Sequence, residues 1–288
     1  MRGSYIKYFA ALLLFGSNGL VASYIALSSY EIVFLRSLLG SALLVVLFFV
    51  AGGKFTVRQN KRDLFFIALS GAAMAADWLL LFEAYAQIGV SLGMIINYCG
   101  PAIVIAVSAL IFKEKISWAK IIALLAVFAG VVLISGRAVE TSARLSGLLC
   151  AVLSAFAYAA MVIFNKKATR IKGIENAALQ LLCAFLVIAI FVGYKQGFDI
   201  GIYAKDWVPI LWLGLVNTGL ACYLYFSSIG ALPIQTVAIC GYLEPLCAVL
   251  LSVVILHERM LPLQVVGAVL IVGGAIFGER RAKQKGVG

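Results

Sequence analysis

Charged residues are scarce in this chain. They make up 12% of its 288 residues, whereas soluble globular domains carry about 25%. Hydrophobic residues account for 64%, and the mean hydropathy is +1.08. This composition excludes a soluble domain and predicts a protein that crosses the membrane several times.

Residues and motifs of several enzyme classes are also missing. The only histidine, His257, is not part of an HExxH motif, and no GxSG nucleophile motif occurs. An intramembrane aspartyl protease needs two membrane aspartates, and only Asp77 lies inside an apolar segment. We therefore expect neither an enzyme nor a metal or other cofactor, and we keep an intramembrane enzyme as a remote alternative.

The positive charge is not that of a nucleic-acid-binding protein. The net charge of +11 comes from 23 Lys and Arg against 12 Asp and Glu, and the basic residues form short clusters between apolar segments. Such clusters orient membrane proteins, because Lys and Arg are retained on the cytoplasmic side. Their distribution predicts cytoplasmic N- and C-termini for a multi-pass membrane protein.

Apolar runs of about 20 residues, the length that a membrane-spanning helix needs, predict an all-α bundle of ten transmembrane helices. Several connections are too short for anything but antiparallel neighbours. The expected segments are about Tyr5–Leu27, Ile32–Ala51, Leu64–Ala86, Ser91–Phe112, Trp118–Ser135, Gly147–Phe164, Asn176–Tyr194, Trp207–Ser227, Pro233–Leu256 and Pro262–Phe277.

The chain contains an internal repeat. GPAIVIAVSALIFKEKI, from Gly100, matches EPLCAVLLSVVILHERM, from Glu244, so that Pro101 and Pro245 lie 144 residues apart. Other pairs at or near this offset are Glu31 with Glu175, Asp63 with Asp206, Glu114 with Glu258, and Gly130 with Gly274. We therefore expect two copies of five helices each, residues 1–144 and 145–288.

Because five is odd, the second copy begins on the opposite side of the membrane, and the two copies form inverted repeats. This is the usual architecture of alternating-access transporters, whose substrate site lies near the midplane between the halves. A duplication that merely enlarged a structural bundle is the alternative.

Several motifs resemble those of one transporter family. NYCGP and FKEKIS in the fourth segment, YLEPL and LHERM in the ninth, and WLLLFEAY from Trp78 are similar to EamA-like transporters of the drug/metabolite transporter superfamily. The resemblance covers essentially the whole chain. It implies secondary transport of a small metabolite, such as an amino acid or related amine, through a central cavity lined by both halves.

Four charged residues lie within or near the apolar core: Arg36, Asp77, Glu83 and Glu244. We expect Arg36 to snorkel or to pair with a nearby carboxylate such as Glu31 or Glu83, and a ligand-binding role is the alternative. Glu83 is expected either in such a pair or at the outer mouth of the pathway. Glu244 either supports the backbone opened by Pro245 or shares an acidic site with Asp77, the leading functional candidate.

Carboxylates at the midplane suit two functions. They can bind an amine-bearing substrate, or they can exchange a proton, because desolvation disfavours their charged form. We hypothesise proton-coupled transport through Asp77, Glu244 and Glu83, with export as the expected direction. An uncoupled facilitator and a flippase for a lipid-linked substrate are the alternatives.

Amphipathic side chains near these acids are predicted to line the substrate site, although ordinary helix packing would also account for any one of them. Asn97 and Tyr98 precede Pro101, and Tyr242 precedes Pro245, so both loosened turns present polar groups near the midplane. The full expected set is Asn18, Asp77, Trp78, Asn97, Tyr98, Tyr158, Asn217, Tyr223, Tyr242 and Glu244.

The matched glycines Gly130 and Gly274 permit close helix contact in lipid. They predict either a scaffold within one chain or a dimer seam. The sequence is thus compatible with a monomer or a homodimer.

Overall fold

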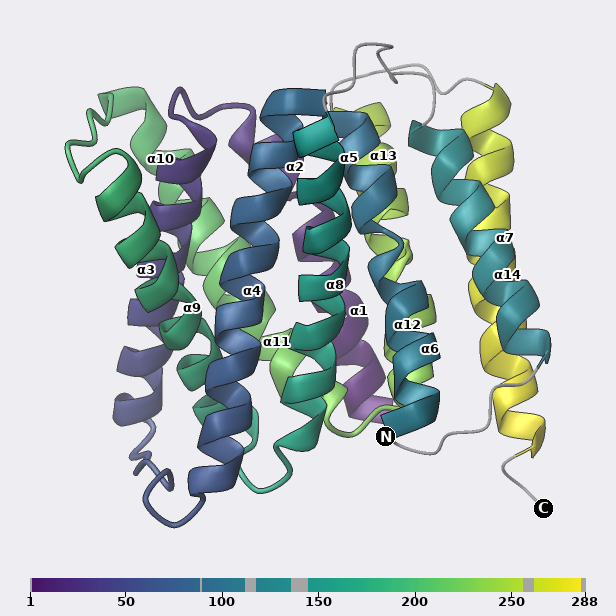
Figure 1. Ribbon diagram of the computed structural model, residues 1–288, viewed down its shortest axis with the longest axis horizontal. Helices are drawn as coiled ribbons and strands as arrows, with labels where there is room; N and C mark the ends of the chain where they lie inside the picture. Colours follow the sequence, from purple (N-terminus) through teal and green to yellow (C-terminus); the bar gives the residue numbers. More distant parts are fainter. Residues whose placement is uncertain (1, 89, 112–117, 136–144, 256–261, 286–288) are drawn as a thin grey trace.

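The computed structural model describes residues 2–88, 90–111, 118–135, 145–255 and 262–285. Within these ranges every regular element is a helix, as the composition predicts (Figure 1). A helix satisfies its own backbone hydrogen bonds, which lipid cannot do, so long apolar runs fold as helices in a bilayer. Glu114, His257 and Glu258 lie outside the described residues.

Among the described residues, six helical stretches are long and apolar enough to cross a membrane. Four of them are the single helices α3 (Ser29–Val50), α4 (Lys61–Ile88), α8 (Leu145–Lys167) and α9 (Gly173–Lys195). The stretch Gly3–Ala22 consists of most of α1 (Arg2–Gly16) followed by α2 (Asn18–Ala22). The stretch Ala204–Ile229 is made up of four consecutive elements: η2 (Ala204–Asp206), α10 (Trp207–Leu211), the π-helix η3 (Trp212–Leu220) and α11 (Ala221–Ile229).

The other apolar segments consist of shorter helices. The segment predicted near 91–112 is divided into α5 (Val90–Asn97) and α6 (Gly100–Ile111), and that near 233–256 into α12 (Ile234–Gly241) and α13 (Leu243–Ile255). Each interruption comes just before a proline, Pro101 or Pro245, because proline lacks the N–H of a helical hydrogen bond and clashes with the preceding turn. The last two helices are α7 (Trp118–Ser135) and α14 (Pro262–Lys285).

The helices pack in pairs. α4 packs along α8 and α3 along α9, while α7 and α14 lie side by side at one edge of the bundle (Figure 1). A Cβ on Gly130 would lie 2.6 Å from the carbonyl oxygen of Gly267, and a Cβ on Gly274 would lie 3.1 Å from that of Ala123. The matched glycines therefore join α7 to α14 within one chain, which is the first of the two predicted roles.

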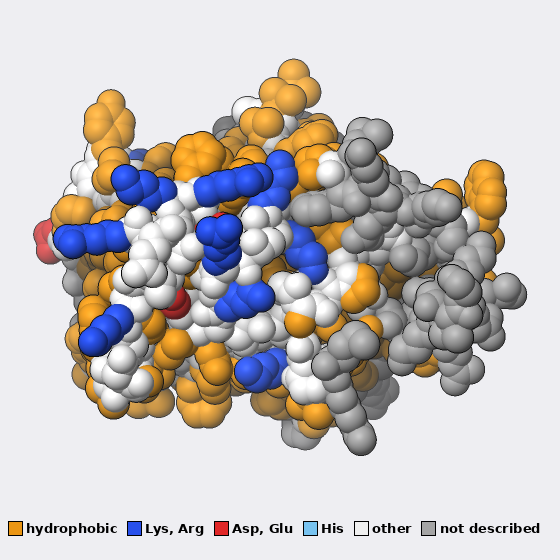
Figure 2. All heavy atoms as spheres, turned by 90° about the horizontal axis from the view of Figure 1, so that it is seen from below, with side chains coloured by type: hydrophobic (Ala, Val, Ile, Leu, Met, Phe, Trp, Pro, Cys, Tyr) orange, Lys and Arg blue, Asp and Glu red, His pale blue; other side chains and the backbone are white. Residues whose placement is uncertain are grey.

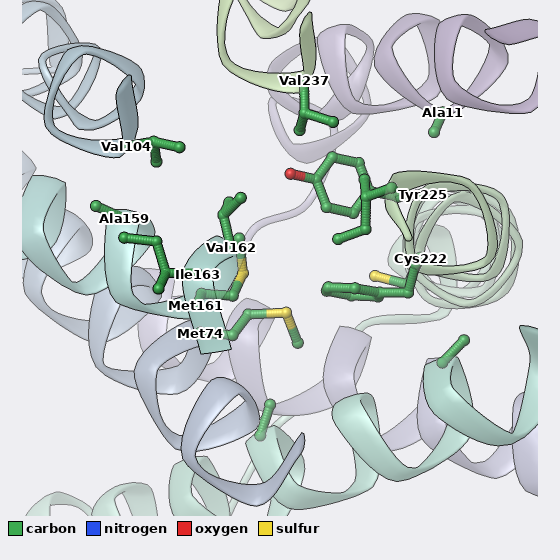
Figure 3. Packing of buried hydrophobic residues seen from close by; sticks show 14 of the residues in the cluster. Ala11, Met74, Val104, Ala159, Met161, Val162, Ile163, Cys222, Tyr225 and Val237 are labelled. Carbon is green, nitrogen blue, oxygen red and sulfur yellow. The ribbon is translucent and has the colours of Figure 1, made fainter. Parts of the chain in front are cut away.

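The main core lies where α1, α4, α8, α11 and α12 meet. Met74 of α4 and Met161 of α8 extend toward Cys222 and Tyr225 of α11 (Figure 3). Met side chains are flexible, so they fill irregular gaps between helices that do not pack in regular ridges.

The outer surface is apolar around the bundle and basic at one end. Large hydrophobic side chains are exposed along several helices, including Val50 (79%), Ile190 (74%) and Val269 (65%). Such a surface fits hydrocarbon rather than water. Figure 2 shows Lys and Arg gathered over the end at which α1 begins, where α3 and α8 end and α4 and α9 start. The connections and the adjoining helix ends carry Lys54, Arg58, Lys61, Arg62, Lys166, Lys167, Arg170 and Lys172.

Candidate functional site

Asp77 is the centre of a buried polar cluster that connects three helices. The side chain lies on α4 and is 5% exposed. The side-chain amide of Asn97, at the end of α5, donates to Asp77 Oδ1 over 2.8 Å and to Ser154 Oγ of α8 over 3.0 Å. The break between α5 and α6 therefore brings a polar amide to the carboxylate. Asp77 and Asn97 were both predicted from the sequence as site residues, and the structure places both in this cluster.

Arg36 and Trp78 form a second part of the site. Arg36 of α3 is 8% exposed, and its guanidinium lies 4.4 Å from the centre of the Trp78 ring. Its Nε donates to Thr218 Oγ1 over 3.0 Å, and Thr218 itself donates to the carbonyl of Leu213, five residues earlier in the π-helix. The π-helix therefore presents a hydroxyl to a buried cation, in keeping with the frequent occurrence of π-helical turns at functional sites.

The prediction that Arg36 snorkels or pairs with Glu31 or Glu83 is wrong. Glu31 forms a capping box with Ser28 at the start of α3, and Glu83 is engaged elsewhere. Close approach of α3 to η3 draws Arg36 inward instead, because a Cβ on Gly40 would lie 2.9 Å from Thr218 and 3.1 Å from the backbone nitrogen of Gly219. Only a glycine allows the two helices to come this near.

The two interrupted helices meet at their breaks. The hydroxyl of Tyr242 donates to the carbonyl of Tyr98 over 2.7 Å, and the ring centres are 6.3 Å apart. These tyrosines lie 144 residues apart, the offset of the internal repeat. Pro101 cannot bond the carbonyl of Asn97, and Pro245 cannot bond that of Gly241, so the breaks concentrate polar backbone groups near the cluster.

Glu244 lies half-buried in the first turn of α13. Within the described part of the chain its carboxylate accepts no hydrogen bond, so the predicted bond to backbone groups opened by Pro245 is not formed there. A share in an acidic site with Asp77, the second possibility, stays a prediction.

Tyrosines also pack around the two helix breaks. Tyr158 of α8 packs over Gly100, where a Cβ would lie 2.7 Å from the tyrosine ring. A Cβ on Gly241 would face the hydroxyls of Tyr8, at 3.5 Å, and Tyr158, at 3.6 Å. Tyr8 also donates to the carbonyl of Val237 over 2.6 Å and is fully buried.

Three predicted residues lie elsewhere. Asn217 of η3 donates to the carbonyl of Leu14, to Ser17 Oγ and to Asn18 Oδ1 over 2.7–3.2 Å, so Asn217 and Asn18 support the break between α1 and α2. The ring of Tyr223 lies 5.4 Å from Lys7 Nζ. These contacts are those of helix packing, the alternative kept open for this set.

Glu83 also lies apart from Asp77, at the far end of α4. It forms an ion pair of 3.0 Å with Lys195 of α9 and accepts a hydrogen bond from Gln87 over 2.9 Å. The hydroxyl of Tyr30 donates to the same carboxylate, and Lys195 donates to Tyr30 over 2.8 Å. This network fastens α3, α4 and α9 together.

Tyr8, Ser154 and Thr218 were not among the site residues predicted from the sequence, and Arg36 was expected in a structural role. Ser154 lies one helical turn before Tyr158, and this i, i+4 spacing was a usable signal. Thr218 carried no such signal, because its position depends on the π-helix. No group of three or more His, Cys, Asp or Glu in the described ranges is placed to hold a metal ion.

Comparisons with known proteins agree on a membrane transporter. The EamA-like transporter family matches this chain twice, at residues 3–136 and 145–278. The chain is 25% identical to the uncharacterized transporter YxxF of Bacillus subtilis, over 93% of this chain and 87% of that protein. It is 23% identical to the uncharacterized inner membrane transporter YicL of Salmonella typhimurium, over 98% of each.

One solved crystal structure has the same fold. It superposes with a TM-score of 0.84 over 97% of this chain and 98% of its own, at 17% sequence identity. The helical arrangement, including the parts on either side of the polar cluster, is therefore one that an experimentally determined protein adopts.

Proposed function

The chain belongs to the EamA-like transporter family, and on this premise we propose that it exports an amino acid or related amine across the bacterial cytoplasmic membrane by alternating access. The observation that carries the proposal is the buried cluster of Asp77, Asn97 and Ser154 beside the broken helices. A buried carboxylate in a membrane protein is costly, so it points to a binding or proton-transfer function.

We propose ten membrane spans in this chain, with both termini in the cytoplasm. Beyond the six long stretches, α5 with α6, α12 with α13, and the paired helices α7 and α14 supply four further segments. The basic end of the bundle in Figure 2 supports the orientation, because Lys and Arg collect on the cytoplasmic side.

We also propose that residues 1–144 and 145–288 are inverted repeats. The same family matches each half separately. Contacts between α7 and α14 are reciprocal. A Cβ on Gly130 would approach Ile271, and a Cβ on Gly274 would approach Val127. Gly130 and Gly274 are 144 residues apart, and so are Val127 and Ile271. Tyr98 and Tyr242 also touch, as equivalent residues do when they lie near a two-fold axis.

Proton coupling is the mechanism that we propose for Asp77 and Glu244. Asp77 is bonded to Asn97 at the end of α5, Glu244 lies in the first turn of α13, and the two helix breaks meet where Tyr242 bonds Tyr98. Desolvation in such a site disfavours the charged form of a carboxylate and favours its protonation. An ammonium group of the substrate and a proton then compete for the same site, which produces antiport. Glu83, the third acid expected to carry protons, is bound by Lys195 and Tyr30. We therefore assign it a structural role, in which it connects α4 to α3 and α9.

The test is flux of a labelled amino-acid mixture from proteoliposomes that contain the purified chain, with and without an imposed pH gradient. We expect the gradient to accelerate flux in the wild type. Asp77→Asn should lower flux about tenfold or more, as loss of a charged hydrogen-bonding group does, and should abolish the response to the gradient.

Asp199→Asn is the matched control, because Asp199 is exposed in the loop before η2. It should behave like the wild type. Equal flux with and without the gradient in the wild type would favour the uncoupled facilitator, and an unchanged response in Asp77→Asn would remove Asp77 from the mechanism.

A further inference from the structure

Arg36 is a buried cation with most of its hydrogen-bonding capacity unused. A guanidinium carries five N–H donors, and only Nε has a partner, Thr218, among the described residues. The one ion pair in the described part of the chain joins Lys195 to Glu83. Four donors of Arg36 therefore have no carboxylate to bind among the residues that the structure describes.

The position of this guanidinium is fixed on two sides. The Trp78 ring lies against its face, 4.4 Å away, and Thr218 holds its edge. Both groups are uncharged, so they orient the cation without neutralising it. An oriented guanidinium binds a carboxylate through two parallel hydrogen bonds, and holding it in advance reduces the entropy lost on binding.

Two acidic residues lie on elements that adjoin this part of the site. Asp77 directly precedes Trp78, whose ring stacks on Arg36, and Glu244 lies in the first turn of α13, just after the helix break where Tyr242 bonds Tyr98. The site thus combines one cation with carboxylates. A ligand with an anionic and a cationic group close together matches this arrangement, whereas two carboxylates would repel a doubly charged phosphate.

We propose that Arg36, held on Trp78, binds the carboxylate of the transported molecule, so that the substrate is a zwitterion of the α-amino-acid type rather than a simple amine. This inference rests on the proposed transport function and adds the anionic half of substrate recognition. Asp77 and Glu244 then bind the ammonium group.

Competition between matched compounds tests the inference. Flux of a labelled amino-acid mixture into proteoliposomes is measured against three pairs of unlabelled competitors: phenylalanine and phenethylamine, histidine and histamine, and lysine and cadaverine. Members of a pair share a side chain and an amine and differ in the carboxylate. In the wild type, we expect at least one amino acid to compete about tenfold or more better than its amine, the effect of a charged hydrogen-bonded contact.

Arg36→Gln should bring this ratio close to one, through weaker competition by the amino acid and unchanged competition by the amine. Arg62→Lys is the control, because Arg62 also lies over an aromatic ring, Phe66 at 5.8 Å, but at the start of α4. It should leave the ratio unchanged. A retained ratio in folded Arg36→Gln would overturn the inference.

Thr218→Val covers the case in which Arg36→Gln does not fold. It keeps the arginine and removes the acceptor that orients Nε, so the ratio should fall by a smaller factor, and an unchanged ratio would contradict the proposal. Amines that compete as well as amino acids in the wild type would overturn this inference and leave the proposed function standing. If neither class competes or is transported, both fail.

Discussion

Gly100 stands 144 residues before Glu244, and the contrast between the two positions has a steric cause. A Cβ at residue 100 would lie 2.7 Å from the ring of Tyr158 and 3.1 Å from the carbonyl oxygen of Ala155. The first half therefore has no room for a side chain at the place where the second half carries an acid. This packing makes the polar site asymmetric.

Gly100→Ala should lower the free energy of unfolding by about 1–3 kcal/mol, the usual cost of forcing extra volume into a packed core. Gly273→Ala is the control, because nothing lies within 4 Å of its Cβ position in α14; it should stabilise the protein by up to about 1 kcal/mol, through better helix propensity. Thermal unfolding of both variants in the same detergent measures the difference. Equal effects would show that α8 does not need a glycine opposite Tyr158.

At the scale of whole elements, two matched aspartates have unlike surroundings. Asp63 at the start of α4 accepts hydrogen bonds from the backbone N–H groups of Arg170 and Ile171, in the connection between α8 and α9. Asp206 in η2 is fully buried, and neither of its oxygens has a partner among the described residues. Asp63 thus anchors a loop, whereas the desolvation of Asp206 is not compensated by a hydrogen bond from any described residue.

Asp63→Ala should destabilise the protein by about 2–3 kcal/mol, because it leaves two backbone donors without their charged acceptor. Asp206→Ala should change the free energy of unfolding by less than about 1 kcal/mol or stabilise the protein, since removal of an unpaired buried polar group is close to neutral or favourable. Thermal unfolding under identical conditions compares them. A larger loss from Asp206→Ala would contradict the assignment of the anchor to Asp63.

The π-helix η3 affects the site because it carries Thr218, the hydrogen-bond partner of Arg36. The repeat offset is 143 residues at Asp63 and Asp206 and 144 residues at Pro101 and Pro245. One extra residue therefore lies between them in the second half, and a π-helical turn accommodates such an insertion without breaking the span. The same turn presents Thr218 to Arg36.

For the whole molecule, the orientation in the membrane is open to a direct test. Gln59 lies exposed between α3 and α4, and Asp199 lies exposed between α9 and η2, near opposite ends of the bundle. In a background without the six native cysteines, a membrane-impermeant maleimide should label Asp199→Cys in intact cells. It should label Gln59→Cys only after permeabilisation, because that connection is on the cytoplasmic side. Labelling of Gln59→Cys in intact cells would reverse the proposed orientation.

Much of the helical framework could be predicted because apolarity and proline act locally on the backbone. A run such as Ser29–Val50 has to form a helix in lipid, whatever its neighbours. Pro101 and Pro245 interrupt their helices through a missing donor and a local clash. Asp77, in the apolar part of α4, was recognisable as a candidate site for the same reason, since the cost of a carboxylate in an apolar segment does not depend on its contacts.

Which residues come together in the site depended on tertiary structure. Arg36 and Thr218 are 182 residues apart, and Asp77 and Ser154 both bind Asn97 from different helices. Whether such side chains meet depends on how each helix is rotated and how closely its neighbours approach, as at Gly40. A bundle of apolar helices, interrupted at two prolines and with carboxylates in its core, follows from the order of the residues alone. Only the packing decided that Arg36 would join the site and that Glu83 and Asn217 would fasten the helices around it.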